Sequence, residues 1–463
     1  MSGSYEVCVV GAGPAGAALA ARLAALGHDV VVVERHPFPR PHVGESLSPA
    51  AWPVLDALGV SEQVAAAGFT RTVQARVRWR DGGEELVGAD GLTVDRAVFD
   101  AILLERARAA GAAVRTGAAA RRPVRRDTGW DVALDDGALH ARFLADASGR
   151  RRLLGGRRTP SSASTLALHA IWCEEPAPAG AQTRIEALDD GWLWGARLPG
   201  GGFRAIAFVD PETLVAAGRD RERLYRRLLA GSSLFADLGA GPAGRVQACD
   251  ATSYVAATPI DAQSVKVGEA AFAIDPLSSS GVQTAIQTGL AAAAAVHSLL
   301  APDGDAGAAI AFYTDHQRHS VQRHAATAAG VYAEHRPQRD ERFWRRRATG
   351  APPDRAGAPQ AARPALADLL PRRVRLARAA TLRATPCLVE DRVELRRALV
   401  HPVLDRPVAF LCGSELAPLL DGLRASATLA DAVCGWERRL APGHGHEIAR
   451  WLSARGLIEV VTE

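Results

Sequence analysis

The stretch EVCVVGAGPAG, residues 6–16, joins a short apolar, β-rich run to a glycine-rich turn. A strongly helix-forming segment follows at 17–26, and after Gly27 a second apolar run at 30–33 ends at Glu34. Apolar runs on either side of a helical segment predict two strands, buried on both faces and connected by a helix. We therefore expect an α/β fold that begins with a βαβ unit.

The glycines of this turn have the spacing of a dinucleotide-binding motif. Gly-x-Gly-x-x-Gly between a strand and a helix, with an acidic residue about 20 positions further on, is typical of such sites. Gly11 would permit the tight turn, Gly13 would let the backbone approach a pyrophosphate at the helix N-terminus, and Gly16 would allow close helix–strand packing. Glu34 could accept hydrogen bonds from ribose hydroxyls. The pattern predicts a bound dinucleotide.

The composition is that of an ordinary globular protein. Of 463 residues, 48% are hydrophobic and 23% are charged, which is enough for packed cores and gives no sign of global disorder. The 55 basic and 51 acidic residues leave a net charge of +4, and Lys266 is the only lysine. This small, dispersed excess indicates no nucleic acid or other polyanionic partner.

The cysteines and apolar runs exclude further classes. Six cysteines stand far apart without a Cys-x-x-Cys pair, and the histidines lack metal-ligand spacing, so neither a disulfide scaffold nor a metal site is indicated. The N-terminus lacks a basic region and a signal h-region, and the run 285–300 is mostly alanine, too weakly apolar to span a bilayer. We expect a cytoplasmic protein with no membrane partner.

Changes in composition and in the expected secondary structure divide the chain into four regions. Residues 159–262 read as short strands punctuated by Gly and Pro, whereas 266–289 return to strand, glycine-rich loop and alanine-rich helix. The expected fold is a Rossmann-like domain with an inserted mixed β-sheet domain and a small winged-helix-like C-terminal domain. The expected boundaries are 1–70, 91–158 and 263–335 for the dinucleotide-binding domain, 71–90 and 159–262 for the substrate domain, 336–384 for a linker or wrapping segment, and 385–463 for the C-terminal domain.

Further motifs follow in a characteristic order. Glu34-Arg35 is followed by Val94-Asp-Arg96-x-x-Phe99-Asp100, by Asp146-Ala-Ser-Gly149, and by Gly268-Glu269 with Asp275-Pro276-Leu-Ser-Ser-Ser-Gly281. With these motifs, over about residues 5–330, the chain resembles the FAD-dependent monooxygenases. The resemblance is to the branch that holds flavin-dependent halogenases, geranylgeranyl-reductase-like enzymes and aromatic hydroxylases. It implies that the dinucleotide is FAD.

The resemblance also assigns flavin-binding residues. Arg96 would lie near the FAD diphosphate or ribityl chain, and Glu269 would hold a ribityl hydroxyl, where the family usually has Asp. The helix after Gly281 would direct its N-terminal N–H groups at the flavin pyrimidine edge and so favour the anionic reduced flavin. The implied set is Gly11, Gly13, Pro14, Ala15, Gly16, Glu34, Arg35, Ser46, Arg96, Asp146, Gly149, Glu269, Pro276, Gly281 and Val282.

The segment Val43-Gly-Glu45-Ser46-Leu47 admits two interpretations. By itself it indicates an exposed glycine turn capped by Ser46. After a flavin motif it resembles the Gly-Glu-Ser segment of the halogenase-like branch, which would place Glu45 and Ser46 beside the flavin or its oxygen-reacting side. The candidate catalytic residues are then His42, Glu45, Ser46 and Ser279, with His42 as a hydrogen-bond donor or a proton acceptor.

Two departures from the halogenase pattern disfavour halogenation. Halogenases of this branch need a lysine early in the substrate region to hold the hypohalous acid, and no lysine precedes Lys266. Their Trp-x-Trp-x-Ile-Pro motif is only echoed by Trp192 and Trp194, with the proline displaced to Pro199. These tryptophans either share one packed face of a strand or line an aromatic substrate pocket.

Residues 385–463 lie outside the flavin fold. Their strand pieces and three short helical patterns are similar to the small peptide-binding domains of modified-peptide pathways; the alternative is a lid or a dimerisation appendage. Together with the flavin core, they make the chain resemble the flavoprotein monooxygenases that hydroxylate a peptidyl tryptophan during tryptophylquinone cofactor biogenesis. The nearest type matures quinohemoprotein amine dehydrogenase, a post-translational modification.

This resemblance implies that reduced FAD binds O₂, forms a C4a-hydroperoxide and hydroxylates an indole ring of a peptide or protein substrate. The electrons would come from NAD(P)H directly or from a separate flavin reductase. One alternative is a small-molecule aromatic hydroxylase or halogenase-like enzyme of secondary metabolism, with the C-terminal region as a lid. Another is a geranylgeranyl-reductase-like flavin reductase, and a third is a non-catalytic flavoprotein scaffold.

Overall fold

The computed structural model describes residues 3–79, 83–173, 181–239, 241–335, 342–349 and 365–461. The chain forms two compact units. Unit 1 is Met1–His297 with Tyr313–Pro353, and unit 2 is Ser298–Phe312 with Asp354–Glu463. Within the described ranges, no helix combines the length and the apolar character that crossing a membrane requires.

The first sheet of unit 1 confirms the predicted βαβ start. β1 (Gly3–Val10) runs parallel to β2 (Val30–Glu34), with Val7 opposite Val30, and α1 (Pro14–Ala25) connects them. The valines of both strands are buried because helices and loops cover both faces of the sheet. The sheet has seven strands, in the order β6-β2-β1-β9-β8-β7 with β17 paired to β9. The remaining strands are β6 (Ala113–Thr116), β7 (Val124–Arg126), β8 (Gly129–Leu134), β9 (Gly137–Asp146) and β17 (Ser264–Lys266).

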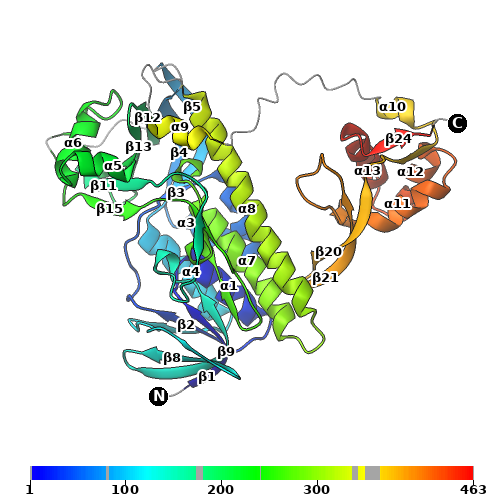
Figure 1. Cartoon of the computed structure of the whole chain (residues 1–463), viewed down its shortest axis with the longest axis horizontal. Coiled ribbons are helices and arrows are strands. Elements are labelled where there is room, and N and C mark those ends of the chain that lie inside the picture. The colour runs from blue at the N-terminus through cyan, green and yellow to red at the C-terminus, as the bar shows by residue number, and fades with distance from the viewer. Residues whose placement is uncertain are drawn as a thin grey trace. The chain divides into compact units, whose positions relative to one another are not determined.

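Helices of unit 1 pack closely on this sheet (Figure 1). α1 packs against α4 (Arg96–Ala109), and α7 (Gly281–Leu300) comes so near that a Cβ on Gly289 would lie 2.4 Å from the Ala15 carbonyl oxygen. From α8 (Ala306–Glu334), the Tyr313 hydroxyl donates to the carbonyl of Lys266 at 2.7 Å. Two short helices, α2 (Trp52–Leu58) and α3 (Ser61–Ala66), complete this part.

The second sheet of unit 1 combines two separated parts of the chain. Its order is β15-β11-β14-β13-β12-β4-β5-β3, and it is mixed, as predicted, because β12 runs parallel to β4 while the other neighbours are antiparallel. Its strands are β3 (Ser46–Leu47), β4 (Thr70–Arg78), β5 (Glu84–Thr93), β11 (Leu166–Trp172), β12 (Ala181–Leu188), β13 (Gly191–Arg197), β14 (Phe203–Val209) and β15 (Gln247–Asp250).

The elements around this sheet separate its two faces. α5 (Pro211–Ala216) and α6 (Arg221–Ala230) follow β14, and Leu224 and Tyr225 of α6 pack with Phe203 and Leu168 of the sheet in one apolar core. A small sheet of β10 (Arg158–Pro160), β16 (Tyr254–Ala256) and β18 (Phe272–Ala273) lies where the chain leaves and re-enters the first sheet. The opposite face of the second sheet packs against a cluster of aromatic side chains.

A helix from the predicted linker belongs to an aromatic cluster on this opposite face. α9 (Arg342–Ala348) buries Phe343 and Trp344. The Trp344 indole N–H donates to the Leu188 carbonyl at 2.9 Å, and its ring meets Trp79 edge-on at a centroid distance of 5.2 Å. Within the segment expected to be a linker or a wrapping segment, residues 342–349 pack on the sheet, because two large aromatic side chains there find an apolar surface to bury. Residues 336–341 and 350–364 of that segment lie outside the described residues.

Unit 2 has its own apolar core, formed by three helices and short strands. α11 (Leu416–Ala425), α12 (Leu429–Glu437) and α13 (His444–Ala454) pack through Leu420, Val433, Trp436, Ile448 and Leu452. α10 (Leu366–Leu369) and β19 (Val374–Leu376), both in the predicted linker, also belong to it, since β19 pairs with β24 (Ile458–Val460). The other strands are β20 (Thr381–Val389), β21 (Arg392–Val400), β22 (Phe410–Leu411) and β23 (Ser414–Glu415).

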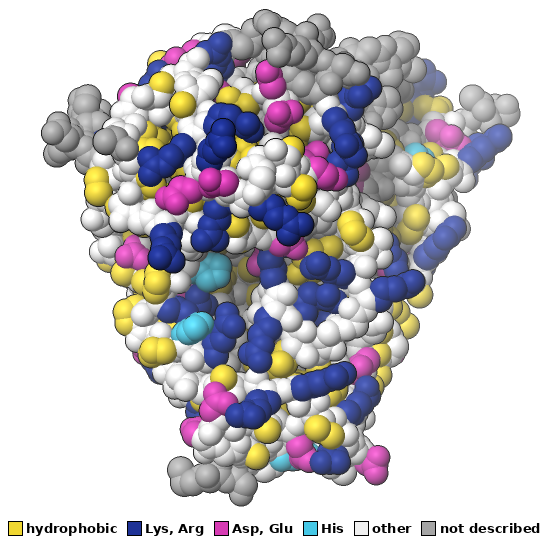
Figure 2. Space-filling model, turned by 60° about the vertical axis from the view of Figure 1, so that its left-hand side comes forward, with side chains coloured by type: hydrophobic (Ala, Val, Ile, Leu, Met, Phe, Trp, Pro, Cys, Tyr) yellow, Lys and Arg dark blue, Asp and Glu magenta, His cyan; other side chains and the backbone are white. Residues whose placement is uncertain are grey.

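Many surface arginines are paired with carboxylates. Arg71 lies 2.7 Å from Asp90, and Arg115 lies 2.8 Å from Asp136, in solvent-accessible ion pairs of a kind that contributes little to stability. Figure 2 shows one face of the molecule, on which basic side chains are interspersed with acidic ones. On that face the positive charge is not gathered into one continuous patch.

The docking of α9 predicts a large effect of removing its tryptophan. Trp344→Ala should destabilise unit 1 by about 3–5 kcal/mol, because it removes a buried ring and leaves a cavity. Arg342→Ala, at an exposed position of the same helix, should change stability by less than about 0.5 kcal/mol. Denaturant unfolding of both variants measures this, and equal midpoints would contradict the assignment of α9 to the core.

Candidate active site

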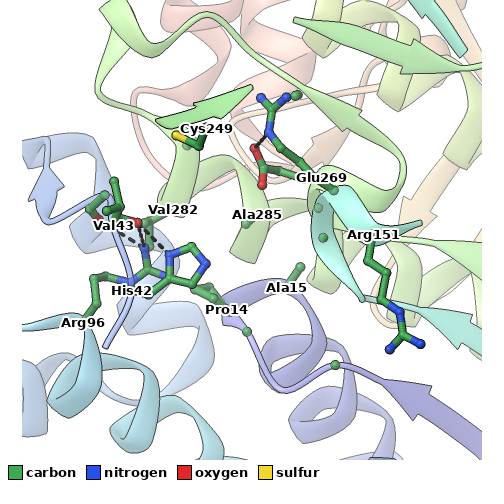
Figure 3. A pocket seen from close by; sticks show the side chains of 18 of the residues that line it. Pro14, Ala15, His42, Val43, Arg96, Arg151, Cys249, Glu269, Val282 and Ala285 are labelled. Atoms are coloured by element: carbon green, nitrogen blue, oxygen red, sulfur yellow. Dashed lines mark hydrogen bonds and ion pairs between the residues drawn. The ribbon is translucent and has the colours of Figure 1, made fainter. Parts of the chain in front are cut away.

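Unit 1 contains a cleft of about 1010 Å³ between its two large sheets. Its walls come from the glycine-rich turn, the segment 33–46, the loop 147–151, one face of the second sheet and the segment 267–285. Figure 3 shows part of it, with Pro14 and Ala15 at the start of α1 and Val282 and Ala285 in the first turns of α7. The volume is at the upper end for ligand pockets, which suits a ligand as large as a dinucleotide.

Most of the predicted site residues meet in this cleft. Of the predicted flavin-binding set, only Gly16 and Asp146 do not line it. The four catalytic candidates His42, Glu45, Ser46 and Ser279 line it, as do Trp192 and Trp194. The sequence motifs thus converge on one place, although several of the side chains have tasks that the motifs do not reveal.

The three glycines of the turn are needed for different reasons. Gly11 has φ +109°, and a Cβ there would lie 2.3 Å from the Ala147 carbonyl oxygen; a Cβ on Gly16 would lie 2.0 Å from the carbonyl of Gly11. A Cβ on Gly13 would meet only the Arg40 guanidinium, at 3.6 Å. Gly13 therefore keeps the cleft open at the N-terminus of α1, where unsatisfied backbone N–H groups favour an anion.

Glu34 is held at the end of β2 by backbone donors. Its carboxylate accepts from Ala12 N–H at 2.9 Å and from His36 N–H at 3.0 Å, and the side chain is buried. A carboxylate has further lone pairs, so it can still accept from a ribose hydroxyl. Glu34 fits the predicted role, and Arg35 lines the cleft beside it.

Arg96 ties a loop to α4. Its Nε and Nη2 donate to the Asp100 carboxylate at 2.8 and 3.1 Å, and Nη1 donates to the carbonyls of Val43 and Gly44 at 3.0 and 3.2 Å (Figure 3). The resemblance implies a contact with FAD, and Arg96 does line the cleft. Its hydrogen bonds to the backbone also hold the 43–44 loop in place.

Asp146 and Glu269 have protein partners. Asp146 is fully buried, and it accepts from the N–H groups of Ser148 and Leu154 at 3.0 and 2.8 Å, so it shapes the turn around Gly149 rather than facing the cleft. Asp146 is therefore not placed to contact a cofactor in the cleft directly. Glu269 lines the cleft and accepts from Arg150 Nε at 2.9 Å. Its remaining carboxylate lone pairs can accept from a ribityl hydroxyl.

The buried side chain of Asp275 stabilises the segment that precedes α7. Asp275 accepts from Leu277 N–H and from the Tyr332 hydroxyl, both at 3.0 Å, and burial raises the pKa of this carboxyl. The bonds fix the turn that contains Pro276 and Ser279. α7 begins two residues later, with Gly281 and Val282 in the cleft wall, so its positive N-terminal end borders the cleft as predicted.

Glu45 is buried and fully paired. Its Oε1 accepts from Nε and Nη2 of Arg204 at 3.0 and 2.8 Å, and its Oε2 accepts from Gly44 N–H at 2.9 Å. Both carboxylate oxygens of Glu45 are thus engaged by donors of the protein itself. The structure shows that Glu45 contacts Arg204, 159 residues away in the sequence, and the catalytic role of Glu45 stays a prediction.

His42 and Ser46 lie on either side of Glu45. The His42 ring is exposed, and its Nδ1 lies 2.7 Å from the Val43 carbonyl, so Nδ1 is the donor in that bond (Figure 3). Partial loss of hydration, and then the charge of Arg96, lowers the pKa of His42. Ser46 lies in the short strand β3. Both residues stay candidates for contacts inside the cleft.

The second sheet supplies a flat wall of two side-chain rows. Residues directly opposite each other on neighbouring strands share a face. One row is Gln247, His169, Ile206 and Trp194, and the next is Cys249, Ala167, Phe208 and Trp192. Trp192 stacks on Phe208 with centroids 4.1 Å apart. Trp192 and Trp194 share a packed strand face and also line the cleft, and their place in an aromatic substrate pocket stays a prediction.

His169 and Arg204 are functional candidates that the sequence analysis missed. His169 is buried in β11 and lines the cleft, and its Nδ1 lies 3.3 Å from Nη1 of Arg204 in β14. Burial, and then the charge of Arg204, lowers the pKa of His169 to about 4. The only sequence signal was an arginine within the otherwise apolar run Phe203–Val209.

Two other sequence features do not add a site. The hexapeptide GAGPAG occurs again at 239–244, where it precedes β15 and no helix follows it, so it lacks the helix N-terminus that binds phosphate in the first copy. Lys266 does not line the cleft, and its ammonium donates to the Thr258 carbonyl at 3.2 Å. In the described ranges, no group of three or more His, Cys, Asp or Glu side chains is placed to bind a metal ion.

The glycine turn, the acid at the end of β2 and the large cleft define an FAD-binding oxidoreductase. The sequence profile of the FAD binding domain matches residues 4–155. The chain belongs to the tryptophan halogenase family, whose profile matches residues 89–361.

Individual relatives include halogenases and a hydroxylase. Tryptophan 2-halogenase of Chondromyces crocatus is 31% identical over 74% of this chain and 70% of its own length. The solved structure of QhpG, a peptidyl tryptophan dihydroxylase essential for tryptophylquinone cofactor biogenesis, is 28% identical, with a TM-score of 0.78 over 98% of this chain and all of its own. The flavin-dependent halogenase CmlS, 21% identical, has a TM-score of 0.76 over 99% of this chain and 98% of its own, which shows the fold alone.

The glycine turn predicts that fold and flavin binding can be separated by mutation. In Gly13→Ala the new methyl would meet Arg40 at an ordinary contact distance, so the apoprotein should stay folded. The methyl would block the approach of a pyrophosphate to the backbone N–H groups, and the Kd for FAD should rise about tenfold or more. Flavin fluorescence titration and thermal unfolding of the apoprotein measure both effects.

Gly16→Ala is the matched variant with the opposite behaviour. Its Cβ would overlap the Gly11 carbonyl, so the apoprotein itself should lose about 1–3 kcal/mol of stability. Wild-type FAD affinity in Gly13→Ala would show that the turn is not the pyrophosphate site.

Proposed function

We propose that this chain is an FAD-dependent monooxygenase that hydroxylates an indole ring, that of a tryptophan within a peptide. The single observation that carries the proposal is the chemistry of the cleft wall. An aromatic surface of Trp192, Trp194 and Phe208 stands beside His169, and the chain's only lysine lies elsewhere. The wall is built to hold a flat aromatic ring, and it lacks the lysine that halogenases of this branch use for hypohalous acid.

The residues that would hold FAD are consistent with this chemistry. Gly13 and the α1 N-terminus suit the pyrophosphate, Glu34 suits the ribose, and the α7 N-terminus suits the flavin ring. Bound reduced FAD supplies two electrons to O₂, so that one oxygen atom enters the substrate and the other leaves as water. The apolar wall would exclude bulk water from the reacting groups and stack the substrate ring against them.

Two features support a peptide as the carrier of the indole. The overall similarity to QhpG extends over 98% of this chain, unit 2 included. β15, the edge strand of the second sheet, is exposed, and three of its residues, Gln247, Cys249 and Asp250, line the cleft. An extended polypeptide can reach such an edge without passing through a narrow tunnel.

A second candidate function is halogenation of a small indole. Its support is the 31% identity to tryptophan 2-halogenase. A geranylgeranyl-type reductase would need a long apolar tunnel, whereas the wall that the second sheet contributes to this cleft includes His169, Gln247 and Asp250. The electrons would come from NAD(P)H or from a separate flavin reductase, and the rate of flavin bleaching by NADH or NADPH alone distinguishes these sources.

The test is a single-turnover reaction with isotopically labelled oxygen. FAD-loaded protein is reduced without air, then mixed with ¹⁸O₂ in buffer with chloride and bromide, with a tryptophan peptide, its Trp→Phe counterpart, or free tryptophan. We expect one labelled oxygen atom in the tryptophan peptide, because one reduced flavin supplies the electrons for one insertion, and none in the phenylalanine peptide, measured by mass spectrometry. The flavin spectrum should pass through a transient that is neither the reduced nor the oxidised form.

Each contrary outcome selects an alternative. A halogenated product would establish the second candidate. Labelled free tryptophan with an unmodified peptide would establish a small-molecule hydroxylase. Direct return to oxidised flavin with peroxide release, unchanged by any substrate, would favour the reductase.

A further inference from the structure

His169 occupies a singular position in the cleft wall. It lies in the row Gln247, His169, Ile206 and Trp194, directly opposite Ile206 on one neighbouring strand and Gln247 on the other. It is the one ionisable side chain in that row. Trp194 lies in the same row two strands away, with Ile206 between them. Its ring is buried from bulk solvent and lines the cleft.

The neighbour of His169 determines which ring nitrogen carries the proton. Nη1 of Arg204 lies 3.3 Å from Nδ1 of His169. A guanidinium has only N–H donors, so Nδ1 must be the acceptor, and the proton of the neutral ring is on Nε2. The positive charge of Arg204 and the burial of the ring both disfavour a second proton.

Arg204 is itself fixed from the opposite side. Glu45 accepts from its Nε and Nη2, and the backbone next to Glu45 is held by Arg96, which donates to the carbonyls of Val43 and Gly44. Arg96 is in turn paired with Asp100. The guanidinium of Arg204 therefore has little freedom to rotate away from His169.

A fixed Nε2–H donor limits what His169 can bind. An indole ring offers one N–H donor and no conventional acceptor, so His169 cannot pair with the indole nitrogen. The carbonyl oxygens of a peptide backbone are acceptors, and the exposed edge strand β15 lies next to His169 in the sheet. A tryptophan in a peptide carries such a carbonyl a few bonds from its ring.

We propose that His169 is a neutral hydrogen-bond donor that binds a backbone carbonyl of the peptide substrate through Nε2–H, and that Arg204 and Glu45 are positioning residues that fix its tautomer. This inference rests on the proposed function. It assigns His169 to substrate recognition, not to proton abstraction. It also gives a role to the contact between His169 and Arg204.

Three variants test the donor role. His169→Phe keeps a flat ring without a donor, and should raise the KM for the tryptophan peptide about tenfold with unchanged FAD affinity and flavin spectrum. His169→Gln keeps an amide N–H donor and should recover most of this loss. His140→Gln, at a half-buried histidine of β9 that lies outside the cleft and is paired with Asp131 at 3.0 Å, should leave the KM unchanged.

A spectroscopic measurement tests the tautomer without turnover. In ¹⁵N-histidine NMR of the FAD-loaded protein, the signal absent from His169→Gln should show a neutral ring protonated at Nε2 from pH 5.5 to 8. An imidazolium near pH 7 or a proton on Nδ1 would overturn the proposal. A His169→Phe variant with altered flavin affinity and unchanged KM would overturn it too, by showing that the acceptor belongs to FAD.

The wild-type enzyme separates these results from a failure of the proposed function. If wild type hydroxylates the peptide and His169→Phe does so with the same KM, the proposed function stands and the role of His169 is refuted. If wild type modifies no tryptophan peptide, the proposed function fails, and the assignment of a peptide carbonyl fails with it.

Discussion

The Glu45–Arg204 ion pair joins the two walls of the cleft. Glu45 belongs to the loop next to the flavin-binding part, and Arg204 belongs to the middle of the second sheet, with side chains only 4% and 12% exposed. Desolvation makes such a pair expensive unless each charge has further partners. Here Glu45 also accepts from the backbone of Gly44, and Arg204 reaches His169. Loss of either partner would leave a buried, unpaired charge between the walls.

The pair is the centre of a longer polar chain with alternating charge. Asp100 holds Arg96, Arg96 holds the 43–44 loop, that loop presents Glu45, and Glu45 holds Arg204 beside His169. Every link is a hydrogen bond with a charged group, and these are stronger than neutral ones. This series of contacts connects α4 with the face of the second sheet that lines the cleft.

The sequence predicted those parts that depend on local spacing. The βαβ unit and the position of Glu34 follow from contacts within about 25 residues, and both agree with the structure. Contacts stayed unpredicted where a side chain has a distant partner or a local one without a motif. The Glu45–Arg204 contact joins residues 159 positions apart, and the bonds of Asp146 to Ser148 and Leu154 leave no motif. The packed helix α9 could not be predicted because only the folded second sheet offers Trp344 a surface.

By itself, the sequence determined the class of this protein: a flavoprotein whose first strand, turn and helix bind a dinucleotide, with a second sheet inserted. Periodicity and glycine spacing are properties of residues that are close in the sequence, so they can be recognised without a structure. Only the tertiary structure decided which charged side chains are paired, which rows of residues face the cleft, and which nitrogen of His169 carries the proton. Those properties arise from contacts across 35 to 159 residues, and burial makes them strong because water no longer competes.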